Sequence, residues 1–259
     1  QKPDSRFISD GMRLLEELGA ISQSKNKLAK RSRNKSRNQS ISQLTKIGHQ
    51  LSRVPLDPRL ATMVLSSQST NVLHEVVIIA TALSIQDPRE RPSEFKQKSD
   101  ESHARFKDKD SDFISFLNLW DYLIAQQNNE SRSQFRKRCK TEFISYMRVR
   151  EWQDLVFQIE STLAELGIKT NVKMSKSNTQ ELGEEFIDNP TVDRNYQEIH
   201  TAILSGLLSH IGQKIVREDK KSGDKKPKAL GYQGARNSNF HIFPGSNLFK
   251  NTPKWVMAA

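Results

Sequence analysis

The chain has 259 residues, enough for one large domain or for two to three small domains with a buried core. Its 41 Lys and Arg outnumber 30 Asp and Glu, and the resulting charge of +11 and pI near 9.7 favour a polyanionic partner such as nucleic acid. One cysteine, six scattered histidines and no apolar run of transmembrane length argue against disulfides, metal sites and a membrane partner, so we expect a cytoplasmic chain.

The N-terminal part predicts a small helical unit. Residues 7–18 have apolar side chains at helical spacing, and Gly19 supplies a C-terminal stop. Seven Lys or Arg and no acidic residue lie in 25–37, which predicts a disordered basic insertion over 22–40. A second helix over 44–53 ends at prolines. The two helices leave room for a β-wing between them.

The middle of the chain predicts a helical bundle. Residues 60–83 form a nearly continuous apolar helix pair that ends in the proline-bounded loop 86–92. Residues 113–124 place aromatic and aliphatic side chains on one face of a further helix. Another helix begins near Gln134 and either breaks near Arg150 or changes packing partners midway. We interpret its aromatic residues as core, Cys139 within its apolar stripe as a small buried side chain, and the charges of the proline-bounded loop as structural ion pairs.

The C-terminal part changes from helix to strand. Residues 170–194 are polar and without pattern, which predicts a loop insertion. A helix is expected over 196–211 and a basic run over 214–228. Alternating apolar residues in 232–243 predict a strand followed by a PGS turn, and a second strand begins at Trp255.

No motif for ATP chemistry is present in the sequence. A phosphoryl-transfer enzyme needs a phosphate-binding loop and an acidic Mg²⁺ ligand, and neither GxxxxGK[ST] nor an acidic metal motif occurs. No Ser/His/Asp or Cys/His arrangement stands out either. We therefore expect no catalytic residues, no bound cofactor and no metal in this segment.

Seven blocks in fixed order nevertheless resemble one family, the C-terminal half of bacterial DEAH-box ATP-dependent RNA helicases of the HrpA type. The blocks are ISDGMRLLEELGAI, LTKIGHQLSRVPLDPRLATMVL, HEVVIIATALSIQDPRERP, SDFISFLNLWDYL, FRKRCKTEFISYMRVREWQDL, YQEIHTAILSGLLSHIG and YQGARNSNFHIFPGSNLFKNTPKWVM. The resemblance covers almost the whole chain apart from the two basic runs and the 170–194 loop.

The resemblance implies a mostly α fold made of a winged helix, a helical ratchet domain and the first strands of an incomplete OB-fold. The corresponding boundaries are 1–59 for the winged helix with its insertion at 22–40, 60–212 for the ratchet domain with its loop at 170–194, and 213–259 for a basic linker and truncated OB-fold. The chain starts at Gln1 without an initiator Met. We therefore expect RecA-like motor domains, with ATP and Mg²⁺, to lie upstream in a longer protein.

Two groups of polar residues are candidates for contact with RNA. On the helix from Gln134, Lys137 and Arg148 are eleven residues apart and face away from the apolar stripe, with Lys140 nearby. Spacing alone fits a solvated charged face equally well, and the resemblance favours contact. The last block adds residues suited to phosphate and base-edge hydrogen bonds or, alternatively, to ordinary turns: Arg236, Asn237, Ser246, Asn247 and Lys250.

Three functions remain open at this point. The first is an RNA-binding accessory region of an ATP-dependent helicase, which guides single-stranded RNA while the motors hydrolyse ATP. The second is a stand-alone, non-enzymatic RNA-binding module. The third is a winged-helix DNA-binding regulator, but LTKIGHQLSRV offers few of the polar side chains that a recognition helix uses to read bases.

Overall fold

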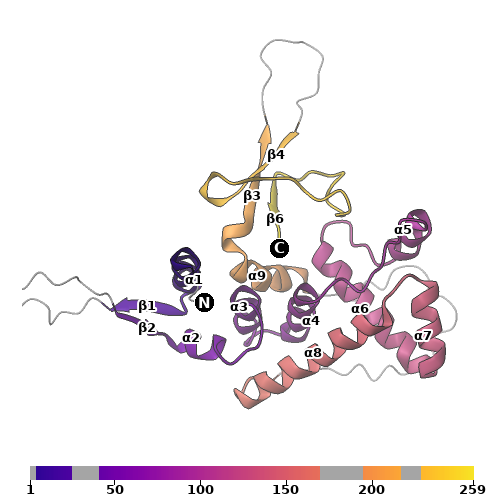
Figure 1. Cartoon of the computed structure of the whole chain (residues 1–259), viewed down its shortest axis with the longest axis horizontal. Coiled ribbons are helices and arrows are strands. Elements are labelled where there is room, and N and C mark those ends of the chain that lie inside the picture. The colour runs from indigo at the N-terminus through magenta and orange to yellow at the C-terminus, as the bar shows by residue number, and fades with distance from the viewer. Residues whose placement is uncertain (1–3, 25–40, 170–194, 217–228) are drawn as a thin grey trace, which may run out of the picture.

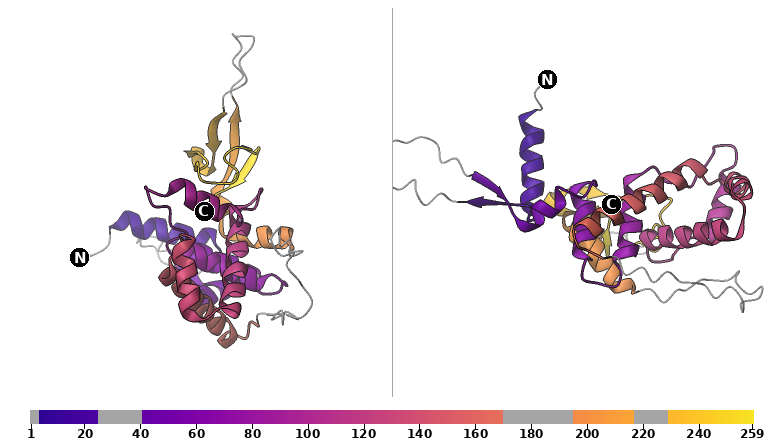
Figure 2. Two further views of the ribbon diagram at one scale, coloured as in Figure 1. Left: turned by 90° about the vertical axis from the view of Figure 1, so that its right-hand side faces the viewer. Right: turned by 90° about the horizontal axis from the view of Figure 1, so that it is seen from below.

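A helical body carries a two-stranded hairpin on one side and a four-stranded sheet on another in the computed structural model, which describes residues 4–24, 41–169, 195–216 and 229–259 (Figure 1). Two views at right angles show the sheet standing above the helices and the hairpin projecting from them (Figure 2). Helices predominate, as the sequence predicted. The predicted 170–194 loop, most of the basic insertion and residues 217–228 lie outside the described residues.

The N-terminal unit has its two predicted helices with a hairpin between them. Its elements are α1 (Ser5–Glu17), β1 (Ile21–Ser24), β2 (Ile41–Leu44) and α2 (Lys46–Leu51). The Asp4 carboxylate caps α1 by accepting from the Arg6 amide, and Gly19 follows the helix at a φ of 68°. The second helix is shorter than predicted because Leu44 pairs with Ile21 in the antiparallel hairpin.

Within the described residues, the bundle contains the predicted apolar helix pair and five further helices around it. Its helices are α3 (Pro58–Ser66), α4 (Leu73–Ser84), α5 (Lys96–Ala104), α6 (Asp112–Asn129), α7 (Arg132–Thr141), α8 (Tyr146–Glu165) and α9 (Tyr196–Gly206). The helices α3 and α9 approach closely at Gly206, where a Cβ would lie 2.3 Å from the Arg59 carbonyl oxygen. Backbone contact at this crossing therefore requires glycine.

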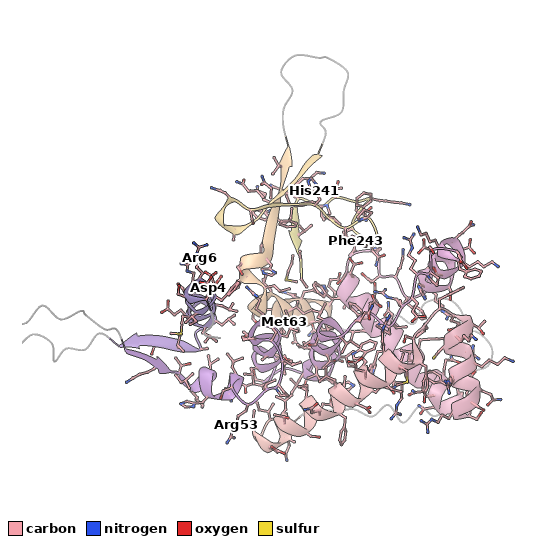
Figure 3. The ribbon with its side chains drawn as sticks, viewed as in Figure 1. Asp4, Arg6, Arg53, Met63, His241 and Phe243 are labelled. Carbon is pink, nitrogen blue, oxygen red and sulfur yellow. The ribbon has the colours of Figure 1, made fainter. Side chains whose placement is uncertain are left out.

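The core of the bundle is apolar and aromatic, as the sequence predicted. Met63, near the centre of the helical body in Figure 3, is fully buried between the helices (Figure 3). Trp152 is also fully buried, and its indole N–H donates to the Ile78 carbonyl and the Thr81 hydroxyl at 3.1 Å each. Trp120 packs edge-on against it at 4.9 Å between ring centroids. These tryptophans are structural and unavailable for stacking on bases.

The helix predicted from Gln134 is interrupted, as one of the two alternatives expected, but the break lies at residues 142–145 between α7 and α8 rather than near Arg150. Phe143 adopts a φ of 56°, in the left-handed region, and Ile144 is buried beside it. The loop after α4 completes the backbone hydrogen bonds at the break: Glu90 N donates to Phe143 O at 2.7 Å, and Ser145 N donates to Pro88 O at 2.8 Å. Tertiary partners thus stabilise an interruption that helical periodicity does not reveal.

The C-terminal sheet has more strands than the sequence predicted. Its strands are β3 (Ile211–Val216), β4 (Ala229–Gln233), β5 (Asn239–Phe240) and β6 (Trp255–Met257), in the order β5-β4-β3-β6 with antiparallel neighbours. The predicted 196–211 helix ends early at Gly206, the strand β3 overlaps the expected basic run, and the 232–243 strand divides into β4 and β5. Pairing with the distant β6 holds β3 in place. The predicted strand at Trp255 is confirmed.

Candidate nucleic-acid interface

The helix α7 presents two of the predicted cations to solvent. Ser131 and Gln134 form a capping box at its N-terminus, and Phe135 and Cys139, four residues apart, bury one face. Burial raises the pKa of the Cys139 thiol to about 11, in keeping with a small buried apolar side chain. Lys137 and Lys140 are exposed on the remaining surface, and neither ammonium group forms an ion pair within the described ranges.

Arg148 does not share that surface, which corrects the expected line of three cations on one helix. It lies in the first turn of α8, beyond the break. Its Nη1 donates to the Asp87 carbonyl oxygen at 3.1 Å and lies 3.9 Å from the Glu90 carboxylate. Arg148 therefore holds the loop after α4 against α8.

Several other charges of the helical body are paired with each other. Glu142, half-buried at the end of α7, accepts hydrogen bonds from Arg105 at 2.5 Å and from the Tyr122 hydroxyl at 2.7 Å, and Arg138 bridges it to Glu130. Burial and the bond to Glu142 raise the pKa of Tyr122 to about 12. This cluster joins α5, α6 and α7.

The proline-bounded loop forms the structural ion pairs that its sequence predicted. Arg89 binds the Asp87 carboxylate at 2.6 Å and lies over the Phe116 ring at 5.0 Å from its centroid. Arg91 binds Asp100 of α5, also at 2.6 Å. These bonds fix the loop that packs against the break between α7 and α8. Both arginines of the loop are paired with carboxylates.

The C-terminal sheet has the opposite charge character. From residue 225 to 259 the sequence contains no Asp or Glu. Lys214 is held by the carbonyl and hydroxyl oxygens of Thr252, at 3.0 Å and 2.7 Å. Lys250 and Lys254 are exposed. A polyanion therefore meets cations on this segment without a competing carboxylate from the same segment.

Three of the predicted polar residues in the last block lie at turns of the chain. Asn237 ends the short 3₁₀ turn η3 (Ala235–Asn237) with a φ of 59°, and its Oδ1 accepts from Gln233 Nε2 at 3.2 Å. Arg236 belongs to the same turn, and its side chain lies outside the described atoms. The Ser246 hydroxyl accepts from the Leu248 amide at 3.2 Å, which is ordinary turn chemistry.

Asn247 fastens the loop after β5 to the start of α6. Its backbone N–H donates to the Asp112 carboxylate at 3.0 Å, and its side-chain amide donates to the Ser115 hydroxyl at 3.0 Å. Lys250 follows in the same loop with an exposed side chain. The structure therefore gives Asn247 a positioning role between the sheet and the bundle.

The two candidate groups are brought to different parts of the molecule. The helix α7 lies low on the right of Figure 1, whereas the sheet stands at the top, and the two remain separated in the turned view of Figure 2. Between them runs the helical body. A single strand that met both groups would have to pass along this body.

A shallow groove elsewhere on the helical body has the wrong charge for RNA. It has a volume of ≈ 820 Å³ and lies between residues 55–57, the end of α4 and one face of α8. Leu60 and Leu155 contribute to its apolar floor, and Asp57, Glu151 and Asp154 contribute carboxylates. A phosphate backbone would be repelled there.

Exposed aromatic side chains near the sheet were not singled out from the sequence. Phe243, Phe249 and Trp255 are exposed, and Figure 3 shows Phe243 on the loop beside the sheet. The available signal was that these residues lie outside the helical patterns that bury Trp120 and Trp152. Among the described residues, no group of three or more His, Cys, Asp or Glu could hold a metal ion, and no helix is long and apolar enough to cross a membrane.

Known proteins match both the helical body and the whole chain. Residues 57–143 match the helicase associated domain (HA2), described as ratchet-like. The ATP-dependent RNA helicase HrpA of Escherichia coli is 47% identical over 259 residues, and the HrpA homolog of Haemophilus influenzae is 46% identical over 257 residues. In sequence, the chain is similar to a part of the HrpA-type ATP-dependent RNA helicases. The predicted family resemblance and ratchet-like domain are thereby confirmed.

The match covers 100% of this chain for the Escherichia coli helicase and 99% for the Haemophilus influenzae homolog, but 17% of the length of each relative. The chain thus corresponds to a part of those HrpA proteins, and the ATP-binding loop and acidic metal motif do not occur in this part.

Proposed function

We propose that this chain binds single-stranded RNA and guides it through an HrpA-type helicase during ATP-driven translocation and unwinding. The observation that carries the proposal is the sheet segment, whose cations meet no carboxylate between residues 225 and 259, attached to ratchet-like helices. Electrostatic attraction to phosphate supplies much of the affinity for nucleic acid. The similarity to proteins named as RNA helicases supports RNA as the ligand.

The domain boundaries are part of the proposal. Residues 1–59 form a winged helix, for which the hairpin β1-β2 between two helices gives support. Residues 60–212 form the ratchet domain, and the matched range 57–143 supports this part. Residues 213–259 form a basic linker and the first strands of an OB-fold, which the antiparallel sheet supports.

We assign direct contact with phosphate to Lys137, Lys140 and Lys250, whose side chains are exposed, and to Arg236, which belongs to the turn η3. Asn237 and Ser246 provide polar atoms at the turns beside them. Arg148 and Asn247 act by positioning, because their side chains hold other elements of the fold. The RecA-like motors, ATP and Mg²⁺ belong to the rest of the parent protein, in the cytoplasm.

A salt titration tests the proposal. Binding of labelled single-stranded RNA should weaken with salt, and each lost phosphate contact should lower the slope of log affinity against log salt by about one. We compare two double variants. One replaces both Lys137 and Lys140 by Ala, and the other replaces both Lys250 and Lys254 by Ala. The matched control removes two exposed cations elsewhere, Lys46→Ala with Lys96→Ala. Equal slopes for all three double variants would contradict the assignment.

Enzyme assays separate the helicase proposal from a stand-alone binding module. The chain alone should hydrolyse no ATP above background, with or without RNA, because it has no phosphate-binding loop. In the parent helicase, replacing Arg236 and Asn237 by Ala should uncouple ATP hydrolysis from unwinding. An unchanged ratio of unwinding to hydrolysis would remove the guiding role, and a parent protein without motor motifs would favour the stand-alone module.

A further inference from the structure

A single row of residues crosses all four strands of the C-terminal sheet. Asn239 of β5 pairs with Gln233 of β4, Gln233 pairs with Gln213 of β3, and Gln213 pairs with Trp255 of β6. Residues directly opposite each other in a sheet point to the same face, with Cβ atoms roughly 5 Å apart. The register therefore brings three amide side chains and one indole into one line.

All four residues of this row are exposed, and 56% of the Trp255 surface is accessible. The two neighbouring rows, one on each side, point to the other face. One contains Tyr232, which is buried opposite Lys214 and stacked on Phe240 at 5.8 Å, and the other contains Val256, which is buried opposite Gly212. The Tyr232 hydroxyl also donates to the Pro253 carbonyl at 2.7 Å. The sheet is thus packed on one face, while at this level its opposite face remains open.

The chemistry of the open row differs from that of an ordinary solvated strand surface. Asn and Gln amides each offer donors and an acceptor, the combination that matches base edges. An exposed indole offers a flat surface on which any base can stack. The row itself carries no charge, and Lys254, exposed beside Trp255, supplies a cation for the backbone.

Charge and polarity decide which partner fits this face. The segment from residue 225 to 259 has no carboxylate, so it attracts a polyanion. A protein interface core is typically apolar and poor in exposed amides, whereas this row has a single aromatic residue flanked by three amides. Single-stranded nucleic acid satisfies both conditions, since its phosphates meet the lysines and its unpaired bases meet the row.

We propose that the row Asn239–Gln233–Gln213–Trp255 is a base-binding platform, on which Trp255 stacks with an unpaired base and the three amides bond to base edges. This inference rests on the proposed binding of single-stranded RNA and names the surface that contacts its bases. Lys250 and Lys254 hold the phosphates beside it. The row thus adds base contacts to a backbone-binding surface.

Trp255 makes the proposal directly measurable. Among the three tryptophans of the chain, Trp120 and Trp152 are buried, so Trp255 is the one that reports on contact with solvent or a base. The experiment titrates the 259-residue chain with a base-bearing single strand and with an abasic strand of the same length and charge. Trp255 emission and fluorescence anisotropy of the labelled strand are followed together.

The base-bearing strand should quench Trp255 and bind roughly 5-fold or more tightly than the abasic strand, because one stacked base stabilises binding by that factor or more. Trp255→Ala and the triple variant Gln213→Ala, Gln233→Ala, Asn239→Ala should each reduce this difference. Both should leave the affinity for the abasic strand unchanged. Trp255→Phe, which keeps an aromatic ring on the strand, should retain part of the difference in affinity between the two strands. Phe157→Ala, an exposed aromatic residue of α8, serves as the control and should change nothing.

Three results would overturn the platform. If both strands bind equally and Trp255 emission is constant, RNA is held by its phosphates alone, and the proposed function survives without the platform. If neither strand binds, both proposals fail. If Trp255→Ala alters the sedimentation of the chain but not the affinity for either strand, the face is a protein contact.

Discussion

The helical body and the C-terminal sheet use their charged residues in opposite ways. In the body, Arg89, Arg105, Arg138 and Arg148 bind carboxylates or carbonyl groups of neighbouring elements. In the sheet segment, no carboxylate is present after residue 224, and Lys250 and Lys254 extend into solvent. These arginines therefore stabilise the fold of the body, whereas the two lysines of the sheet segment remain available to a ligand.

The difference shows why net charge alone does not locate a binding surface. The chain carries +11 overall, yet much of the positive charge on the bundle is committed to internal partners. Removing one partner of an exposed ion pair costs little stability, whereas removing one partner of a half-buried pair costs more, because the remaining charge is left partly dehydrated without its counter-charge. The cations available to a ligand are those left over after this pairing.

The largest effect on stability should come from replacing the buried tryptophan of the bundle, whereas replacing the exposed tryptophan of the sheet should have little effect. Trp152→Ala should lower the free energy of unfolding by about 3–5 kcal/mol, because it empties the centre of the bundle and removes the bonds to Ile78 and Thr81. Trp255→Ala should change it by about 0.5 kcal/mol or less. Urea unfolding measures both. Similar losses for the two variants would mean that the sheet is as tightly packed as the bundle on both faces.

Breaking the Glu142 cluster should have the next largest effect. Glu142→Ala should cost about 1–3 kcal/mol, since Arg105, Arg138 and the Tyr122 hydroxyl lose a half-buried acceptor. Lys250→Ala, in the sheet segment, is the matched control and should stay within about 0.5 kcal/mol. Thermal unfolding checks both variants. A stable Glu142→Ala protein would show that these ions are solvated like those of the sheet.

The ion pair between α4 and α8 should make the bundle sensitive to pH. His74 Nδ1 lies 2.7 Å from the Glu160 carboxylate, and although burial lowers the pKa of His74, the bond to Glu160 leaves it above the usual 6.5. Protonated His74 is therefore favoured in the folded state. The contribution of His74 to the free energy of unfolding is fully present below about pH 6.5 and is lost as the pH rises through the pKa of His74 in the folded state.

The pair of His74 and Glu160 should contribute about 1 kcal/mol or less to the free energy of unfolding, because both side chains are partly exposed. Urea unfolding at several pH values, compared between the parent chain and His74→Gln, measures it. The comparison is needed because burial lowers the pKa of His103, which acts in the opposite direction. An identical pH profile for the two proteins would contradict the assignment to His74.

The smallest effect on stability should accompany the clearest effect on salt dependence. Lys250→Ala with Lys254→Ala should leave the free energy of unfolding nearly unchanged and should lower the salt slope of RNA binding by about two, one for each phosphate contact. Arg89→Ala, in the bundle, should lower the free energy of unfolding and leave the salt slope of RNA binding unchanged. If Arg89→Ala lowers the slope as well, the paired cations of the body also reach RNA.

Local patterns in the sequence determined much of the helical part. The apolar run over residues 60–83 became α3 and α4, the aromatic face of residues 113–124 became the buried side of α6, and Gly19 ended α1. Each depends on interactions within a few residues, which helical periodicity and glycine chemistry describe directly. The quoted blocks also sufficed to predict the similarity to HrpA-type helicases.

Tertiary contacts decided the break after α7, the sheet and the fate of each charge. Phe143 turns into the left-handed region because the loop after α4 bonds to its carbonyl, from some fifty residues away. The strand β3 exists because β6 pairs with it from the end of the chain, and that register creates the exposed row with Trp255. No local pattern encodes such pairings, since the chain entropy of closing long loops is repaid only by contacts that form in the complete fold.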